Sequence, residues 1–341
     1  MSPDLSVAVL GQGLAGTLVS ARLRERGVAH VVIDRGHVGS SSHAAAGLVN
    51  PVTGRRFVLV EGYADYVARF GIYERLGRLL SGVYLQPLTI YRDLSRAEDR
   101  NRWDLRRATP AYAPYLGAPI TADQVDLPRI DSSLWLGPTS LAHRVDVPGL
   151  ICAYRTFCRE AGDLLEVEAQ IEVRPRPGSR LELAGRAFDV VIDCRGAACA
   201  STEAWRDRSW RLSKGESIVA KRARWPRSAA TKLGGRFVAP LGPGQDVWYG
   251  GTSTDHYDDG APTQAFLAEA KNYFSKSPPS EFDHRAGVRP TTTDRRAVVG
   301  AHASIGGLYI CNGLGTRGAL TAPSLSAEVL SILPLGLAAR R

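Results

Sequence analysis

A glycine-rich turn between two apolar runs constrains the fold of this chain more than any other feature. The first run (residues 7–10) leads into the hexapeptide GQGLAG, and the second run ends at Asp34. This pattern predicts a buried strand, a turn, a helix and a second parallel strand. Gly11 allows the tight turn, Gly13 lets backbone amides approach a pyrophosphate, and Gly16 lets the helix pack against the sheet. The pattern predicts a dinucleotide site; the alternative is a glycine turn that binds no ligand.

The acidic residue strengthens the prediction of a ligand. Asp34 lies about 20 residues after the turn, where a carboxylate accepts hydrogen bonds from an adenosine ribose. The phosphates of such a ligand sit at the positive end of the helix dipole.

Composition restricts the class of protein. The chain has 341 residues, of which 44% are hydrophobic and 23% charged, and this length suggests two domains. No apolar run approaches the roughly 20 residues that cross a bilayer, and the first residues lack a secretory signal. Five cysteines occur without CxxC or metal-ligand spacing. We therefore expect a cytoplasmic protein with reduced cysteines, no metal and no membrane partner.

The net charge of +9 has two explanations. One is an arginine-rich composition without a specific role. The other is a polyanionic substrate or partner, because basic surfaces concentrate such ligands. The sequence leaves both open.

Strand patterns change along the chain. A continuous apolar run at residues 189–193, before Gly196, is typical of a parallel strand buried on both faces. Residues 206–284 instead favour antiparallel strands. The predicted fold class is α/β with an α+β cap, and it divides into a discontinuous dinucleotide-binding domain (1–60, 145–205 and 285–341) and an antiparallel-sheet substrate domain (61–144 and 206–284).

Four further motifs identify a family. Residues 41–48 (SSHAAAGL) follow the second predicted strand, and residues 190–196 form another apolar strand that ends in glycine. Residues 287–300 (GVRPTTTDRRAVVG) and 308–323 (LYICNGLGTRGALTAP) lie near the C-terminus. Together with the first turn, these motifs resemble the superfamily of FAD-dependent D-amino acid oxidases and glycine oxidases over nearly the full chain.

The resemblance implies an FAD-binding Rossmann-like domain of the amine-oxidase type. Some members tether the flavin through a cysteine near the third motif, but residues 287–300 contain no cysteine, so noncovalent FAD is expected. The implied cofactor-binding residues are Gly11, Gln12, Gly13, Leu14, Ala15, Gly16, Asp34, Arg35, Ser41, Ser42, His43, Ala46, Gly47, Leu48, Ile171, Cys194, Gly196, Gly313, Leu314, Gly315, Thr316, Arg317 and Gly318.

Two positions depart from the usual family pattern. Cys194 stands where related chains often have Ala or Thr, so this motif alone would also fit any buried strand. The loop at residues 313–318 reads GLGTRG where typical oxidases have Gly-His. This version is most similar to the oxidase domain of the bifunctional tRNA wobble-uridine (carboxymethylaminomethyl) modifying enzymes.

The resemblance also implies substrate contacts. Arg289 matches an arginine that pairs with the substrate carboxylate in glycine oxidase, and its planar guanidinium suits bidentate binding. The alternative for Arg289 is a structural role beside Pro290. Arg317 and Tyr249 are further candidates for substrate binding.

The implied chemistry needs no catalytic side chain of its own. Flavin takes a hydride from the carbon that bears the amine, while the protein positions that carbon and excludes water. The product imine hydrolyses, and molecular oxygen is the expected electron acceptor. Three hypotheses remain: an oxidase of small amines or amino acids, the same chemistry on an amine attached to RNA, a peptide or a carrier, and a non-catalytic FAD-binding subunit.

Overall fold

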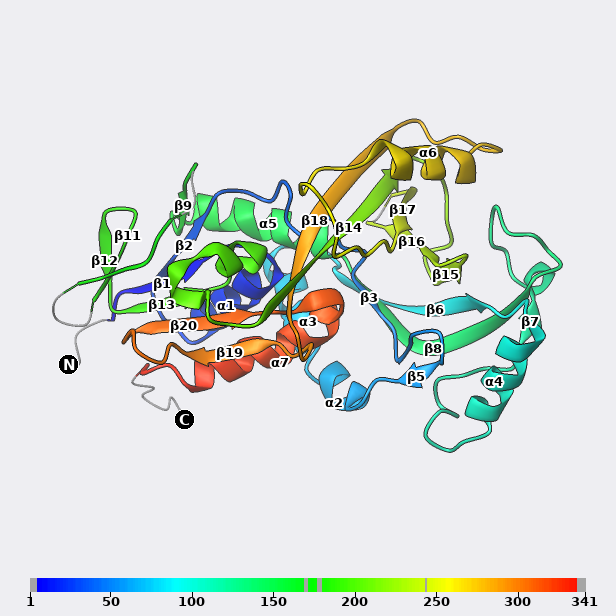
Figure 1. The fold of residues 1–341 in the computed structure, drawn as a ribbon, viewed down its shortest axis with the longest axis horizontal. Helices are drawn as coiled ribbons and strands as arrows, with labels where there is room; N and C mark the ends of the chain where they lie inside the picture. The colour runs from blue at the N-terminus through cyan, green and yellow to red at the C-terminus, as the bar shows by residue number, and fades with distance from the viewer. Residues whose placement is uncertain (1–4, 169–170, 177–179, 243, 336–341) are drawn as a thin grey trace. The chain divides into compact units, whose positions relative to one another are not determined.

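The computed structural model describes residues 5–168, 171–176, 180–242 and 244–335, and Figure 1 shows its fold. The chain forms two compact units. The first unit contains Met1–His43, Leu150–Ser213 and Val288–Arg341, and the second contains Ala44–Gly149 and Lys214–Gly287. Two of the crossings between units fall inside the strands β14 (Trp210–Ala220) and β18 (Phe282–Thr292).

The first unit is built on a six-stranded sheet. Its strands, in their order across the sheet, are β19 (Val298–Ala301), β20 (Leu308–Asn312), β13 (Val190–Asp193), β1 (Val7–Leu10), β2 (His30–Asp34) and β9 (Leu164–Glu166). The strands from β20 to β9 run parallel, and β19 pairs antiparallel with β20 at one edge. The central strands β1 and β13 are entirely buried, which explains their continuous apolar sequence.

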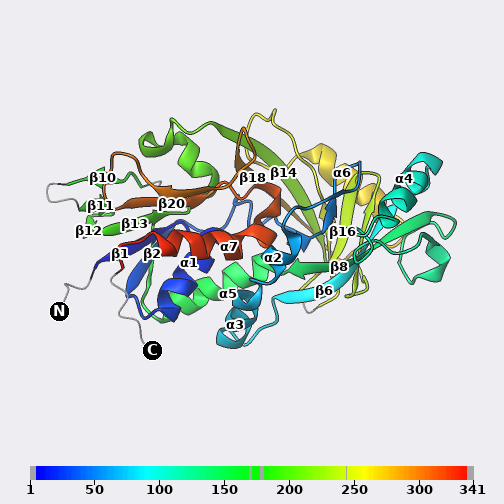
Figure 2. The same cartoon turned by 90° about the horizontal axis from the view of Figure 1, so that it is seen from below.

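Helices and a small sheet cover this central sheet. The helices are α1 (Leu14–Glu25), α5 (Val147–Glu160) and α7 (Gly318–Ser331). Helix α1 packs against α7 (Figure 2), where the Arg22 Nε donates to Ser326 Oγ at 2.9 Å. An apolar cluster joins this sheet to β11 (Leu181–Leu183), β12 (Arg186–Phe188), η2 (Gly196–Ser201) and η3 (Glu203–Trp205). Strand β10 (Arg174–Pro175) pairs with β11.

The second unit is built on a nine-stranded, largely antiparallel sheet. Its order begins with β18 and β14 and continues through β17 (Asp246–Gly250), β16 (Arg236–Leu241), β15 (Ala229–Leu233), β6 (Leu85–Asp93), β8 (Trp135–Val145) and β3 (Leu48–Val49), with β7 (Ile120–Thr121) paired to β8. The pair β15–β6 is parallel. Helix α6 (Gln264–Tyr273) covers one face, where Phe266 and Phe274 pack with Trp225, Tyr249 and aliphatic residues in the core.

The remaining elements of the second unit are short. They are β4 (Val52–Thr53), β5 (Val58–Leu59), α2 (Tyr63–Val67), α3 (Gly71–Leu79), α4 (Ala97–Arg107) and η1 (Ala122–Gln124), while η4 (Gly315–Arg317) precedes α7 in the first unit. None of the helices in the described part of the chain is long and apolar enough to span a bilayer.

The predicted fold class is confirmed, since a parallel sheet with helices and an antiparallel sheet are both present. The unit boundaries differ from the predicted domain boundaries. Residues 44–60 were predicted to continue the first domain, but Ala44 opens the second unit. The reason is strand pairing, because Leu48 and Val49 pair with Arg144 and His143 of β8. The binding roles assigned to the two domains remain predictions.

Candidate functional site

The glycine turn after β1 is shaped by close backbone contacts. Gly11 has φ +96°, and a Cβ there would lie 2.8 Å from backbone atoms of Arg195. A Cβ on Gly16 would lie 1.8 Å from the Gly11 carbonyl oxygen, and one on Gly13 would lie 3.1 Å from Ser42 Oγ. These distances exclude side chains at Gly11 and Gly16 and leave little room at Gly13. The turn therefore has the form that a dinucleotide requires.

The start of α1 suits an anion. Its first turn, which the structure describes in full, contains no acidic residue, and Leu14 N donates to Ser42 Oγ at 3.1 Å. Ser42 comes from the predicted second motif, so the structure brings the two motifs together at the positive end of a helix. Ser41, Ser42 and His43 form part of a turn, and the neighbouring Ser40 bridges Val288, at the start of the third motif.

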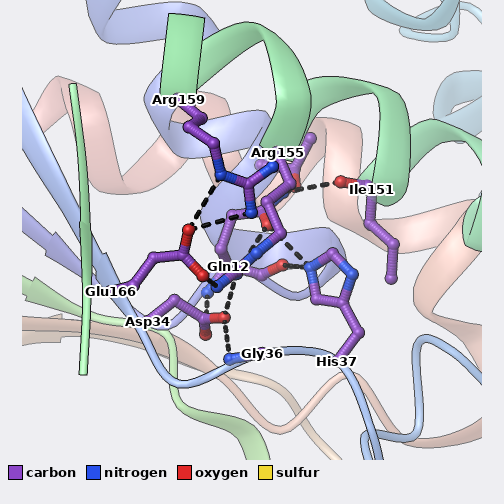
Figure 3. Close-up of polar contacts among 9 residues, drawn as sticks. Gln12, Asp34, Gly36, His37, Ile151, Arg155, Arg159 and Glu166 are labelled. Atoms are coloured by element: carbon purple, nitrogen blue, oxygen red, sulfur yellow. Dashed lines mark hydrogen bonds and ion pairs between the residues drawn. The ribbon is translucent and has the colours of Figure 1, made fainter. Parts of the chain in front are cut away.

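Asp34 lies in a hydrogen-bond network at the end of β2 (Figure 3). Its Oδ1 accepts from Gln12 N at 2.8 Å, and its Oδ2 accepts from Gly36 N at 2.7 Å and from Arg155 Nη1 at 2.5 Å. A carboxylate offers about four acceptor sites, so one site on Oδ1 remains for another donor. The network holds this carboxylate in a fixed orientation.

Arg155 is a site residue that the sequence did not suggest. It comes from α5 and bridges Asp34 to Glu166 Oε2, which it contacts at 2.9 Å (Figure 3). Burial acts to lower the pKa of Arg155, but hydrogen bonds to Glu166 and Asp34 outweigh burial and raise this pKa above its usual value. The guanidinium is thus a permanent charge that orients Asp34.

Gln12 joins the turn to α5 and to His37. Its Nε2 donates to Thr17 Oγ1 and Ile151 O, both at 3.0 Å, while its Oε1 lies 2.6 Å from His37 Nε2. This contact assigns the ring proton to Nε2 of His37. Burial lowers the pKa of His37 and so favours the neutral imidazole. The fully buried Gln12 side chain therefore supports the turn through its hydrogen bonds. Arg35, which follows Asp34 in the chain, is exposed.

The latter half of the second motif belongs to the second unit. Gly47 has φ +69°, and a Cβ there would lie 1.7 Å from the Val145 carbonyl oxygen. The Ala44 carbonyl accepts from Ser217 Oγ at 2.9 Å and from Trp248 Nε1 at 3.1 Å. Ala46 packs beside Trp248, and Leu48 begins β3. This backbone is thus anchored to the sheet of the second unit.

The third segment of the predicted site follows β13. Cys194 is buried and its amide donates to Leu10 O at 2.7 Å, which places it behind the glycine turn. A side-chain hydrogen bond with Cys311 and burial raise the pKa of the Cys194 thiol. Gly196 has φ +62° and accepts from Asn312 Nδ2 at 2.9 Å, and Ile171 accepts from Arg195. These hydrogen bonds hold the segment at the ends of strands β13 and β20.

The C-terminal loop brings a second helix terminus to the site. Gly313 has φ +74°, η4 spans Gly315–Arg317, and α7 starts at Gly318. A Cβ on Gly318 would lie 3.8 Å from Leu14 Cδ2, so the first residues of α7 and α1 are neighbours. The first turn of α7 is described completely and holds no acidic residue. Two positive helix termini therefore meet in the first unit. Leu314 is half-buried, while Thr316 and Arg317 are exposed.

Arg289 lies on β18 beside this loop. Val288 bridges Ser40, and a Cβ on Gly315 would lie 2.5 Å from Thr291 Cγ2. Because side chains alternate along a strand, Arg289 leaves the strand on the same face as Thr291, toward the loop. Burial lowers the pKa of the Arg289 guanidinium. The first unit thus places a largely buried arginine next to the predicted cofactor loops.

Tyr249 lies elsewhere, in the core of the second unit. Its hydroxyl donates to Glu269 Oε1 at 2.6 Å, and its ring stacks on Tyr273 with centroids 4.8 Å apart. Burial and the Glu269 hydrogen bond raise the pKa of Tyr249. The side chain faces α6, whereas its neighbour Trp248 points to the other face of the sheet. The predicted substrate contact at Tyr249 stays a prediction, since the structure gives this hydroxyl a partner in the core.

Solved structures share this fold. Glycine oxidase from Bacillus cereus matches with a TM-score of 0.77 and 20% identity, over 95% of this chain and 93% of that one. Iminodiacetate oxidase from Chelativorans sp. matches with a TM-score of 0.74 and 20% identity, over 96% and 94%. Glycine oxidase from Geobacillus kaustophilus matches with a TM-score of 0.77 and 19% identity, over 96% and 94%.

The sequence itself matches a family model. The model is described as "DAO: FAD dependent oxidoreductase" and covers residues 6–331. It thus spans all the predicted motifs, from the glycine turn to the end of the C-terminal helix. The chain belongs to the DAO family of FAD-dependent oxidoreductases.

Proposed function

We propose that this chain binds FAD without a covalent bond and oxidises the C–N bond of a carboxylated amine derived from an amino acid. The observation that carries the proposal is Arg289, a largely buried guanidinium beside the cofactor loops of the first unit. Such a group suits the carboxylate of a substrate, because a charge-assisted bidentate pair repays its desolvation.

The first unit offers the groups that FAD needs. The glycine turn and the starts of α1 and α7 would receive the phosphates, and the remaining acceptor site of Asp34 would receive a ribose hydroxyl. Bound FAD would supply the acceptor for a hydride from the carbon next to the amine nitrogen. Arg289 would bind the carboxylate and fix the position of that carbon.

Four of the five cysteines support noncovalent binding. Cys158, Cys194, Cys199 and Cys311 are buried, whereas Cys152 on α5 is exposed. Burial raises the pKa of Cys158 and Cys199, and the contact with Cys311 together with burial raises that of Cys194. A thiol that stays protonated is a poor nucleophile for a flavin ring. Denaturation in acid followed by filtration should therefore release all yellow colour from the protein.

The proposed reaction converts the amine to an imine, and water then hydrolyses the imine to a carbonyl compound and a smaller amine. The electron pair and protons removed from the amine pass finally to molecular oxygen, which becomes hydrogen peroxide. Similar structures bear the names glycine oxidase and iminodiacetate oxidase, and both names denote carboxylated amines. We therefore place glycine, N-substituted glycines and other amino acids first among candidate substrates.

Anaerobic titration of the purified holoprotein tests this proposal. The panel contains glycine, sarcosine, iminodiacetate, D- and L-amino acids, and matched amines without a carboxylate. We expect the visible flavin absorbance to bleach with one or more carboxylated amines, and air to restore it with release of peroxide. Bleaching only by the matched amines without a carboxylate would contradict the role of Arg289, and a chain that retains no FAD would contradict the cofactor site.

An arginine variant sharpens the same test. Arg289→Lys keeps the charge but loses the bidentate geometry, so KM for the bleaching substrate should rise about tenfold or more. The FAD content of the variant serves as the control and should stay unchanged. An unaltered KM would show that Arg289 has a structural role.

A second candidate substrate is an amine attached to RNA. A cavity of about 330 Å³ in the second unit is lined by Arg56, Arg102, Leu105, Arg106 and Thr109, and the chain carries a net charge of +9. Several arginines around one hollow suit phosphate groups. Bleaching by a tRNA that carries carboxymethylaminomethyl-uridine, but by no free amine, would favour this candidate, and bleaching by free amines with no effect of the tRNA would exclude it.

A further inference from the structure

Two cations lie directly opposite each other in the sheet of the second unit. Lys232 of β15 and Arg92 of β6 are register partners in the parallel pair. Lys232 Nζ lies 4.8 Å from the centroid of the Phe237 ring, and Arg92 lies 5.0 Å from that of Phe57. Like charges at facing positions of neighbouring strands destabilise a sheet. This arrangement therefore costs stability in the free protein.

Neither of these two side chains has a carboxylate partner in direct contact within the part of the chain that the structure describes. Among the described residues, no carboxylate forms an ion pair with Lys232 or Arg92. Burial, Arg92 and Arg55 lower the pKa of Lys232 to about 8. Burial lowers the pKa of Arg92 to about 10, against a weaker opposing effect of Asp99.

Other cations of the same sheet show how the protein satisfies a purely structural charge. Lys221 pairs with Asp246 at 2.9 Å, and Arg236 pairs with Glu269 at 2.7 Å. Lys232, a half-buried lysine whose register partner is Arg92, departs from this pattern. Ionisable groups that depart from the structural pattern in this way are candidates for a functional site.

Arg92 is held in a fixed position. Its Nη1 donates to Val52 O at 3.3 Å and its Nη2 donates to Gly54 O at 2.8 Å. A guanidinium has five N–H donors, so donors remain available after these two bonds. Arg55 follows Gly54 directly in the exposed turn between β4 and β5, and its charge, after burial and that of Arg92, also lowers the pKa of Lys232.

We propose that Lys232, Arg92 and Arg55 form an anion-binding site in the second unit, which takes a carboxylate or phosphate group of a ligand. An anion among the three cations converts their mutual repulsion into attraction, and the rings of Phe237 and Phe57 limit access of water to the charges. The site goes beyond the proposed oxidation, because binding an anion requires no flavin chemistry.

Lysine acylation followed by peptide mass spectrometry tests the proposal on the full-length holoprotein. The reagent reacts with the neutral amine, so the rate of Lys232 labelling against pH reports the protonation of this side chain. The exposed Lys271 on α6 is the internal reference. Without added anions, Lys232 should react at a lower pH than Lys271. Inorganic phosphate, a phosphate monoester or a dicarboxylate should slow the labelling of Lys232 and leave that of Lys271 unchanged.

The anions distinguish the ligand groups. Protection by phosphate and its ester alone assigns the site to a phosphate group, and protection by the dicarboxylate alone assigns it to a carboxylate. The proposal would be overturned if no anion slowed the labelling of Lys232. It would also be overturned if every anion slowed the labelling of Lys232 and of Lys271 equally.

Two adjacent residues provide a matched pair of variants. Arg55→Ala removes a cation of the site, and we expect about tenfold weaker protection of Lys232 by the effective anion. Arg56→Ala changes the next residue of the same turn, which lines the cavity beside α4 instead, and should leave the protection intact. Equal effects of the two variants would show that the response reflects overall charge and not a site.

Discussion

Buried cations are treated differently in the two units. In the first unit, Arg195 pairs with the buried Asp193 and Arg155 pairs with Asp34, and despite the opposing effect of burial the pKa of each arginine is raised by these carboxylates. In the second unit, Arg92 and Lys232 face each other and burial lowers the pKa of both. The first arrangement stabilises the fold. The second is unfavourable for the stability of the free protein, and a bound anion can offset that repulsion.

The largest effect that tests this contrast is expected at Asp193. It is fully buried and accepts from Arg195 Nε at 3.0 Å, Arg195 Nη2 at 2.6 Å and Trp205 Nε1 at 3.0 Å. Asp193→Ala leaves the buried Arg195 without its counter-charge, so the free energy of unfolding should fall by about 3–5 kcal/mol. Urea titration measures this loss. A loss as small as that of a surface ion-pair variant such as Glu203→Ala would contradict a stabilising role for the pair.

The next largest effect is expected at Tyr249, on the face of the second unit's sheet opposite to Lys232. Tyr249→Phe removes the hydrogen bond to Glu269 but keeps the stacked ring, so stability should fall by about 1 kcal/mol. The KM of the substrate found by anaerobic titration should stay unchanged if Tyr249 is a core residue. A clear rise in KM at unchanged stability would instead support the substrate contact that the sequence suggested.

Lys232 should respond in the opposite direction to Asp193. Lys232→Met removes a half-buried cation and keeps an apolar side chain of similar length beside Phe237. After allowance for its partial exposure, we expect the free energy of unfolding in phosphate-free buffer to rise by roughly 0.5 kcal/mol. Lys271→Met on the exposed face of α6 is the control and should have no such effect. A loss of stability at Lys232→Met would remove the contrast between the units.

The smallest effect is the dependence of this gain on pH. The folded-state pKa of Lys232 is about 8, below its ordinary value of 10.5. The unfolded chain therefore binds more protons at this residue between these values, and its contribution to stability rises with pH. The advantage of Lys232→Met over the wild type should be greatest below pH about 8 and fade above it. Paired urea titrations across this range measure it, and a difference independent of pH would exclude a lowered pKa.

The local parts of the site were the ones that sequence could predict. The glycine turn depends on backbone geometry within one βαβ unit, so the spacing of Gly11, Gly13 and Gly16 was enough to place it. Arg155 was missed because it reaches Asp34 from α5, far away in the chain. No local spacing predicts such a contact.

Positions that depend on strand pairing were also missed. Leu48 and Val49 pair with β8, and this long-range pairing moved the unit boundary to Ala44. Alternation along a strand places Trp248 and Tyr249 on opposite faces of a sheet, but it does not tell which face α6 covers. Lys232 shares a strand face with Ala230, which is buried in an apolar cluster, and the alternation of residues 230 and 232 is a signal that could have separated this lysine from the surface charges.

The course of the chain through β14 and β18 limits how this protein can be re-engineered or diversified. Each unit is assembled from separate stretches of the gene, and two of the junctions lie within hydrogen-bonded strands, not in loops. A foreign second unit could not simply be inserted as a cassette at flexible sites. A successful graft would have to splice both strands in register, so exchange of this part by recombination is far more demanding than its drift by point mutation.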